Sequence, residues 1–241
     1  MIIDTHVHTI YSKHWFWGFD SLNKPRDMIK IAIKKGLDGV AVTDHNNVRG
    51  SLITKKIAQN FKGFKVITGT EIKTADGDIL ALGVKKDVPS LLSVEETIER
   101  IHDLGGIIIA AHPFGTYVFR KCLEKKAVKA DAIEIYNASL MKVANIKASN
   151  LAKRFKKPVT AGSDAHGLRE IGNGAIVFSG DPLEAILKKK VKLITKKTTL
   201  GDVANLAARK FIRSIEWRVL RKRGKHFFNP INSIKTTISK N

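Results

Sequence analysis

Short apolar, β-rich runs alternate along most of the chain with segments whose apolar residues recur every three or four positions. Such runs are typical of buried β-strands, and the amphipathic segments are typical of α-helices that cover a sheet. We expect strands at 2–4, 39–42, 64–68, 78–82, 107–111, 132–136, 158–160, 175–178 and 191–194, and helices at 25–35, 52–61, 93–101, 140–155 and 182–190.

Several predicted helices carry the residues that favour helix ends. Pro25 stands in the first turn of the segment 25–35, and Gly36 follows its last residue. Ser93 is followed three residues later by Glu96, which is the spacing of a capping box. Strands that alternate with helices favour an α/β fold with a parallel sheet, either closed into a barrel or open and doubly wound.

The turn at Gly77 makes the run 78–82 the expected hairpin partner of the preceding strand. The pattern changes after Thr199, because residues 201–223 are expected to form one long helix with basic side chains around it. We therefore predict two parts. Residues 1–199 form a catalytic domain, and residues 200–241 form a basic helical C-terminal extension.

The chain of 241 residues is 43% hydrophobic and 27% charged, which is typical of a globular protein with a sizeable core. No run approaches the roughly 18 apolar residues of a transmembrane helix, and Met1 begins without a basic leader. We therefore expect a cytoplasmic protein without a transmembrane segment. Cys122 is the single cysteine, so any metal must be held by His, Asp and Glu.

Lys and Arg outnumber Asp and Glu by 43 to 22, which gives a net charge of +21 and a pI near 10.1. Residues 181–241 contribute +12 of this charge. Such a field attracts polyanions or anionic substrates. The basic tail either binds nucleic acid, with Phe227 and Phe228 available for stacking, or forms the solvated face of an amphipathic helix. Adsorption to a membrane surface is a third alternative.

Candidate ligands for metal ions follow the predicted strands. In a barrel of parallel strands these loops converge on one face, where divalent cations would stabilise the dense group of carboxylates and imidazoles. His6 and His8 also lie on one side of an extended segment, so they can bind one ion. The residues concerned are His6, His8, His14, Asp44, His45, Glu71, His112, Asp164 and His166.

The motifs DTHVHT, TDHN, GTEI, AHP and SDAH occur in the order found in the PHP (polymerase and histidinol phosphatase) superfamily. The sequence resembles the small stand-alone metal-dependent phosphoesterases of that superfamily, over residues 1 to about 197. The resemblance implies a distorted (β/α)7 TIM-like barrel that binds two or three divalent ions, which could be Mn2+, Zn2+, Mg2+ or Fe2+.

The resemblance also implies a set of ligands for each ion. One ion is held by His6, His8, Glu71 and Asp164, a second by Glu71 and His112, and a third by His45, His166 and His14. We interpret Asp44 as a carboxylate that orients a metal-bound imidazole, or as a proton acceptor.

One position departs from the pattern of the superfamily. Relatives often carry a histidine in the hairpin segment, where this chain has Asp78. A carboxylate there would ligate the second ion and favour harder cations such as Mn2+ or Mg2+. Alternatively, Asp78 is only a hairpin-turn residue and the second metal site is weakened.

These features predict a hydrolase in which water activated at a di- or trinuclear metal centre attacks a phosphomonoester, a nucleotide or an oligonucleotide. Arg49 and Arg120 are candidates to bind the substrate phosphate, although both could be solvated surface residues. The aromatic residues 15–19 form either a lid over the site or part of the core. The alternatives are an RNA-binding protein of the ribonuclease P-associated type, which would use the basic C-terminal region, and a histidinol phosphatase.

Overall fold

The computed structural model describes residues 1–12, 20–115 and 121–199, together with Gly201, Ala204, Ala208 and Phe211. The chain divides into two compact units, Met1–Thr199 and Leu200–Asn241. In the second unit the four described residues are helical and exposed. The role of this extension stays a prediction. Among the described residues, no helix is both long and apolar enough to cross a bilayer.

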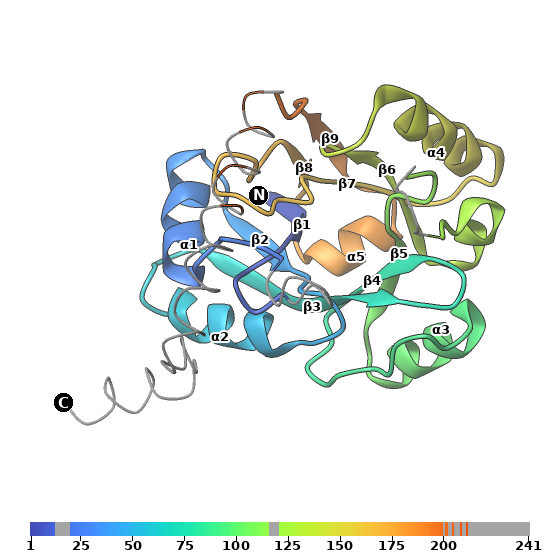
Figure 1. Cartoon of the computed structure of the whole chain (residues 1–241), viewed down its shortest axis with the longest axis horizontal. Coiled ribbons are helices and arrows are strands. Elements are labelled where there is room, and N and C mark those ends of the chain that lie inside the picture. Colours follow the sequence, from blue (N-terminus) through green and yellow to red (C-terminus); the bar gives the residue numbers. More distant parts are fainter. Residues whose placement is uncertain are drawn as a thin grey trace. The chain divides into compact units, whose positions relative to one another are not determined.

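Nine strands form one sheet in the first unit, in the order β7-β6-β5-β4-β3-β2-β1-β8-β9 (Figure 1). The strands are β1 (Ile2–Val7), β2 (Gly39–Val42), β3 (Lys65–Lys73), β4 (Asp78–Leu82), β5 (Ile107–Ala110), β6 (Ala132–Asn137), β7 (Val159–Gly162), β8 (Gly174–Val177) and β9 (Lys192–Thr195). Each expected strand is present, within a few residues of its predicted bounds.

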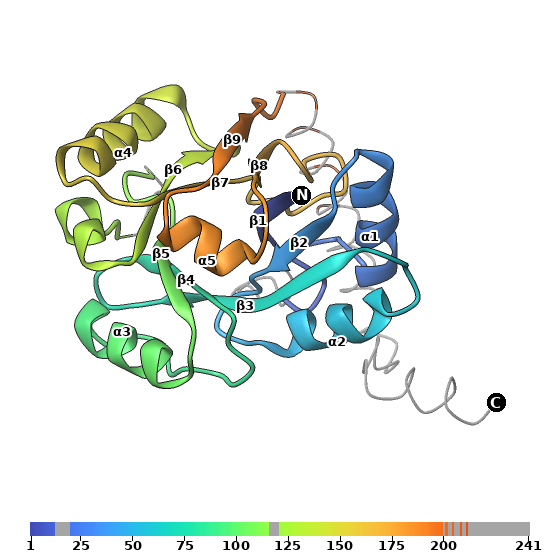
Figure 2. The same cartoon turned by 180° about the vertical axis from the view of Figure 1, so that it is seen from behind.

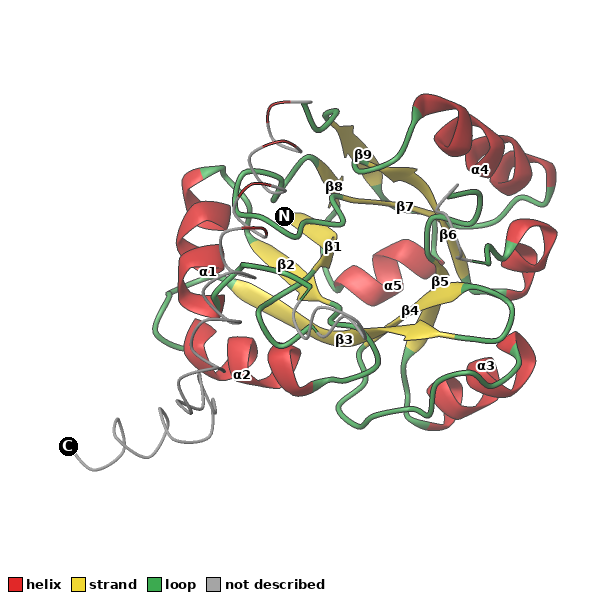
Figure 3. Cartoon of the chain, viewed as in Figure 1, coloured by secondary structure: helices red, strands yellow, loops and turns green. Residues whose placement is uncertain are grey.

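The described residues form five α-helices, and all but the last of them lie outside the yellow strands in Figure 3. They are α1 (Pro25–Lys34), α2 (Arg49–Ala58), α3 (Val94–Asp103), α4 (Lys142–Arg154) and α5 (Pro182–Leu187), with a 3-10 helix at Glu124–Lys129. The predicted capping box is confirmed at α3, where the Ser93 hydroxyl accepts a hydrogen bond from the Glu96 N–H (3.2 Å). Helix α2 begins three residues earlier than its apolar pattern predicts.

The sheet curves until β1 and β7 meet, so the barrel is nearly closed. The N–H of Asp164 donates to the carbonyl of His6 (2.9 Å), and the N–H of His8 donates to the carbonyl of Ala165 (3.1 Å). The predicted barrel fold is therefore confirmed. These bonds fix the loop after β7 against the end of β1, where candidate ligands are concentrated.

Helix α5 lies across one opening of the barrel in both Figure 1 and Figure 2. Its buried residues Ala185 and Ile186 join a core cluster with Ile3, Leu80 and Ile109 from the strands. Two further clusters lie between the sheet and the outer helices. Apolar side chains therefore fill one end of the barrel, which leaves the other end for polar groups.

The sheet is not parallel throughout. Strand β4 runs antiparallel to β3 and β5, which confirms the predicted hairpin. Strand β8 runs antiparallel to β1 and β9, so the expectation of a parallel repeat is wrong there. A parallel connection needs a crossover, usually a helix, and residues 163–173 contain none. The chain instead turns back and adds β8 beside β1.

Asp4 joins three segments at the closure of the barrel. Its carboxylate is fully buried and accepts hydrogen bonds from the backbone N–H groups of His6 (3.2 Å), Ser163 (3.0 Å) and Gly172 (2.8 Å). Burial raises the pKa of Asp4 to about 6, while these hydrogen bonds act in the opposite direction. The geometry makes Asp4 a structural residue.

We expect Asp4→Ala to lower the free energy of unfolding by about 2–4 kcal/mol, because three buried N–H groups lose their acceptor. Urea denaturation followed by circular dichroism measures this loss. The matched control is Asp103→Ala, because Asp103 is an exposed carboxylate at the end of α3. Equal effects of the two substitutions would contradict the assignment.

Candidate metal centre

The candidate ligands meet at the barrel opening opposite α5. Parallel strands direct their carboxyl ends to one face, and these ends carry His6 and His8 (β1), Glu71 (β3), His112 (β5) and Asp164 (β7). Asp78 is the first residue of β4 and is paired with Lys73 of β3. Because β4 runs antiparallel, its amino end lies at the same opening as the carboxyl ends of its neighbours.

The first group consists of His6, His8, Glu71 and Asp164, whose ligand atoms all lie within 4.8 Å of one another. The Nε2 atoms of His6 and His8 are 3.1 Å apart, so the two imidazoles do point to one side of the strand. The Nε2 atom of His8 lies 3.2 Å from a carboxylate oxygen of Glu71 and 3.2 Å from one of Asp164. All four residues are buried. Two imidazoles and two carboxylates thus converge on one point.

Glu71 lies between this group and a second one. Its Oε2 atom is within 3.3 Å of His6 Nε2, whereas its Oε1 atom is 2.9 Å from His112 Nε2. Glu71, Asp78 and His112 form the second group, and all three are buried. The two oxygens of one carboxylate therefore face two different sets of ligands, which is the arrangement expected of a bridging residue.

The position of Asp78 bears on the two interpretations of this residue. The turn of the hairpin ends before it, and its carboxylate lies within 4.8 Å of the ligand atoms of Glu71 and His112. These positions favour the interpretation of Asp78 as a ligand over its interpretation as a hairpin-turn residue. Coordination of a cation by Asp78 stays a prediction, which this proximity supports.

A third group brings together His8, Asp20, His45 and His166. The carboxylate of Asp20 lies 2.7 Å from His166 Nε2 and 3.4 Å from His45 Nε2. His14, which we predicted here, lies outside the described residues. Sequence reasoning missed Asp20 because it looked for a third histidine at a fixed spacing from the opening pair. The signal was present, since Asp20 is a carboxylate in the same strand-end loop.

The shifted pKa values of His6 and Asp20 show that the buried carboxylates of the site are stabilised by nearby positive charge. Burial alone would lower the pKa of His6, but the nearby carboxylates of Asp164, Glu134 and Glu71 hold it well above its ordinary value. Burial would raise the pKa of Asp20, but His166 and His45 hold it well below its usual range. Bound divalent cations would supply the charge that protons on these imidazoles otherwise provide.

Glu134 orients the ligands from β6. Its Oε1 atom lies 3.0 Å from Nδ1 of His6, and its Oε2 atom accepts hydrogen bonds from the N–H of His112 (2.8 Å) and the side chain of Asn137 (3.0 Å). This fully buried carboxylate was also missed. Its signal was a charged residue between Ile133 and Ile135 in an apolar strand, which we interpreted only as a strand.

Asp44, which we interpreted as an orienting carboxylate or a proton acceptor, is held by Thr9. Its two carboxylate oxygens accept hydrogen bonds from the N–H and the hydroxyl of Thr9, each at 2.6 Å. It is fully buried, and burial raises its pKa. Asp44 thus fixes the loop after β1, and its role at the metal centre stays a prediction.

The backbone is adapted to the close packing of the ligands. A Cβ atom on Gly162 would lie 2.4 Å from Cβ of His6 and 2.5 Å from Oε1 of Glu134, so only glycine fits there. His112 and Asp164 have φ values of 28° and 54°, which non-glycine residues rarely adopt. Strained backbone of this kind is concentrated at functional sites.

The predicted substrate contacts are only partly described. Arg49 is exposed at the start of α2, and its guanidinium lies over the ring of Tyr11 at 5.4 Å. It therefore stands beside the loop of His45, although its contact with a substrate stays a prediction. Arg120 and the aromatic residues of the segment 15–19 lie outside the described residues.

The donor atoms fit divalent metal ions. Imidazole nitrogens and carboxylate oxygens are the ligands of Zn2+, Mn2+ and Fe2+, and the three overlapping groups offer three or four of them each. Without cations, so many buried carboxylates would be costly to hold together. The number and identity of the ions stay predictions.

Comparison with known proteins gives related sequences and folds. The family model described as PHP-associated matches residues 142–190. An uncharacterized protein of Methanocaldococcus jannaschii, MJ1587, is 43% identical over 144 residues, which are 57% of this chain and 82% of the relative.

Solved structures share the fold. A two-domain protein of Bacteroides vulgatus, which contains a predicted PHP-like metal-dependent phosphoesterase, is 16% identical with a TM-score of 0.65. The match covers 81% of this chain and 65% of that chain. A Bifidobacterium adolescentis protein, proposed to be a metal-dependent phosphoesterase, is 18% identical with a TM-score of 0.58. This match covers 86% of this chain and 96% of that chain.

We expect Glu134→Gln to weaken metal binding by about 10- to 100-fold, because a carboxylate that fixes and polarises a ligand imidazole is lost. The rise of the unfolding temperature with added Mn2+, measured on metal-stripped protein, gives the affinity. The control is Glu95→Gln, because Glu95 is an exposed partner of Lys129. An unchanged affinity in Glu134→Gln would show that Glu134 has no influence on the ligands.

Proposed function

This chain belongs to the PHP superfamily, and from that membership and the geometry of its candidate centre we propose that it is a metal-dependent phosphoesterase. The resemblance of the sequence motifs to the superfamily is thereby confirmed. At a coarse level the relatives and the centre support a hydrolase. The proposal adds the substrate class, which is a phosphomonoester, a nucleotide or an oligonucleotide.

The observation that carries the proposal is the position of Glu71 between two ligand groups. Its two carboxylate oxygens lie 2.9 Å from His112 and within 3.3 Å of His6. When bound, neighbouring divalent ions supply an activated water and neutralise charge on a phosphate ester. The protein's own contribution is to hold these ligands rigidly, through Glu134 and through the closure of the barrel.

Exposure within the centre indicates where a substrate enters. The side chains of His6 and His8 are fully buried, whereas those of His45 and His166 are 16% and 19% exposed. A substrate therefore approaches over the third group. There Asp20, 2.7 Å from His166, lies in the part of the centre that water and substrate reach.

The positive charge of the chain favours phosphorylated substrates. A net charge of +21 steers anions to the protein, while the site itself is rich in carboxylates that select cations. Nucleic acid as a partner of residues 200–241 and a cytoplasmic location stay predictions.

The first test uses phosphatase and oligonucleotide assays in Mn2+, with His6→Ala. We expect kcat/KM to fall by at least about 100-fold and metal content to fall with it, because His6 belongs to the most buried ligand group. His102→Ala is the matched control, because His102 is an exposed histidine on α3 paired with Asp131. Wild-type protein that hydrolyses neither monoesters nor oligonucleotides would refute the proposal.

The second test concerns Arg49. We expect Arg49→Ala to raise KM by about 5- to 50-fold with little change in kcat, because it removes a phosphate contact made equally before and during reaction. Arg26→Ala is the control, since Arg26 is likewise exposed and lies over an aromatic ring, that of Phe61 at 6.0 Å. Equal KM values for the two variants would show that Arg49 does not contact the substrate.

A further inference from the structure

A second site lies at the other end of β7 from the candidate centre. It is a cavity of about 250 Å3 beside the start of β7 at Val159, whereas Asp164 of the centre follows the end of that strand. Its lining residues come from α4, the adjacent strands and the connection between α5 and β9. They are Ile135, Ser149, Ala152, Lys153, Lys156, Lys157, Val159 and Lys189.

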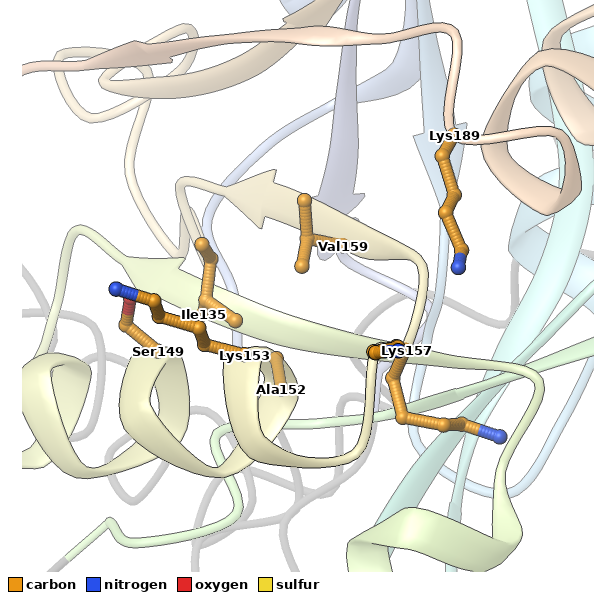
Figure 4. Close-up of a pocket in the computed structure, with 8 residues that line it drawn as sticks. Ile135, Ser149, Ala152, Lys153, Lys157, Val159 and Lys189 are labelled. Carbon is orange, nitrogen blue, oxygen red and sulfur yellow. The ribbon is translucent and has the colours of Figure 1, made fainter.

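The cavity combines an apolar floor with a basic rim. Figure 4 shows Ile135, Ala152 and Val159 between α4 and the strands, with the side chain of Lys189 extending toward them from the far side. Four of the eight lining residues are lysines. Lys153, Lys156 and Lys189 are exposed, and the described ion pairs of the chain include none of these four lysines. The rim therefore presents a positive charge to solvent.

The backbone at two of these lysines is unusual. Lys156 and Lys189 have φ values of 50° and 57°, and each is the second residue after a helix, α4 and α5 respectively. This position favours glycine, because a left-handed conformation is costly for a residue with a Cβ. Helices α1 and α3 do place glycine there, at Gly36 and Gly105.

Helices α4 and α5 thus differ from α1 and α3 in the residue that follows their ends. Where glycine would be the more stable residue, α4 and α5 both have lysine, and both lysines line the same cavity. Packing does not explain the choice, because both side chains are exposed. An unfavourable conformation that occurs at two lysines around one cavity supports a role for their side chains.

An aromatic side chain lies in the same segment. Phe155, which directly precedes Lys156, is 50% exposed, and the guanidinium of Arg154 lies over its ring at 5.6 Å. An exposed ring among lysines is the combination that single-stranded nucleic acids use, with bases stacked on the ring and phosphates bound by the ammonium groups. A depression of about 250 Å3 is large enough for a base or a sugar.

We propose that this cavity and Phe155 bind a single-stranded nucleic acid, whose phosphates contact Lys153, Lys156, Lys157 and Lys189. The site is separate from the candidate centre and does not depend on the proposed phosphoesterase activity. It also differs from the predicted role of residues 200–241, because every residue concerned belongs to the unit Met1–Thr199. It gives the protein a place to hold a strand by its backbone.

The test measures binding of a fluorescent 20-nucleotide 2′-O-methyl oligouridylate, which resists hydrolysis, to the full chain by fluorescence anisotropy. The double variant Lys156→Gly and Lys189→Gly removes two charges at positions where glycine is conformationally favoured. We expect its dissociation constant to rise about tenfold at 100 mM salt, with the salt dependence of log K reduced by about 1.4 for two lost phosphate contacts.

The matched control is Lys55→Gln with Lys56→Gln, in the exposed last turn of α2, because it lowers the net charge equally. We expect the control to change affinity less than about twofold at the same salt. The glycine variant should also unfold at the same or a higher urea concentration than wild type. Weakened binding without weakened folding separates a binding role from a structural one.

Two further variants test whether the oligonucleotide binds at this cavity or at the candidate centre. Phe155→Ala should weaken binding by at least about fivefold through loss of stacking. Glu71→Gln, at the candidate centre, should bind the oligonucleotide like wild type when both are measured in EDTA, because divalent ions that would bind a substrate phosphate at the centre are then removed. Loss of binding in Glu71→Gln would assign the strand to the candidate centre and overturn the proposal.

Other outcomes would overturn it equally. An equal loss of affinity in the Lys156/Lys189 variant and in the Lys55/Lys56 control would show that only the net charge of the protein matters. Competition by inorganic tripolyphosphate as strong as that by the oligonucleotide would indicate a free oligophosphate as the ligand. Binding to phosphatidylserine vesicles that depends on Lys156 and Lys189, with no such dependence for the oligonucleotide, would indicate a membrane surface.

Discussion

The burial of several carboxylates at one end of a barrel is the constraint on which the rest of the structure depends. Glu71, Asp164 and Glu134 are almost inaccessible to water, and ionised groups are stable there only beside positive charge. The imidazole of His6 meets part of that need, and divalent cations would meet the remainder. The apolar helix α5 at the opposite opening keeps the polar groups at one end.

That constraint accounts for features of the backbone that otherwise look unfavourable. Ligands from β1 and β7 approach closely only because Gly162 has no side chain, and Asp164 is held at a positive φ of 54°. The antiparallel direction of β4 brings Asp78 to the edge where the parallel strands end. Asp4 then fixes the two edges that close the barrel. Rigidity is required because metal geometry tolerates little displacement of its ligands.

Local periodicity predicted much of this from sequence. Alternation along β1 places His6 and His8 on one side, and the strand-end rule groups them with Glu71. Asp20 and Glu134 could not be predicted in the same way, because their partners are brought to them by tertiary packing rather than by local sequence. Packing also determines the contacts of Asp44, since its carboxylate accepts a hydrogen bond from Thr9, which local sequence does not suggest. The direction of β8 also depended on packing.

The two ends of β7 carry different kinds of charged groups. At its carboxyl end, carboxylates and imidazoles are buried and need cations, so their positions are fixed by many hydrogen bonds. At its amino end, three of the four lysines are exposed and the described ion pairs include none of them, so their charge is available to a ligand. Gly36 and Gly105 show that this chain uses glycine at helix ends where only conformation matters. Lysine at the two corresponding positions around one cavity is therefore better explained by the ligand that its charge attracts than by the fold.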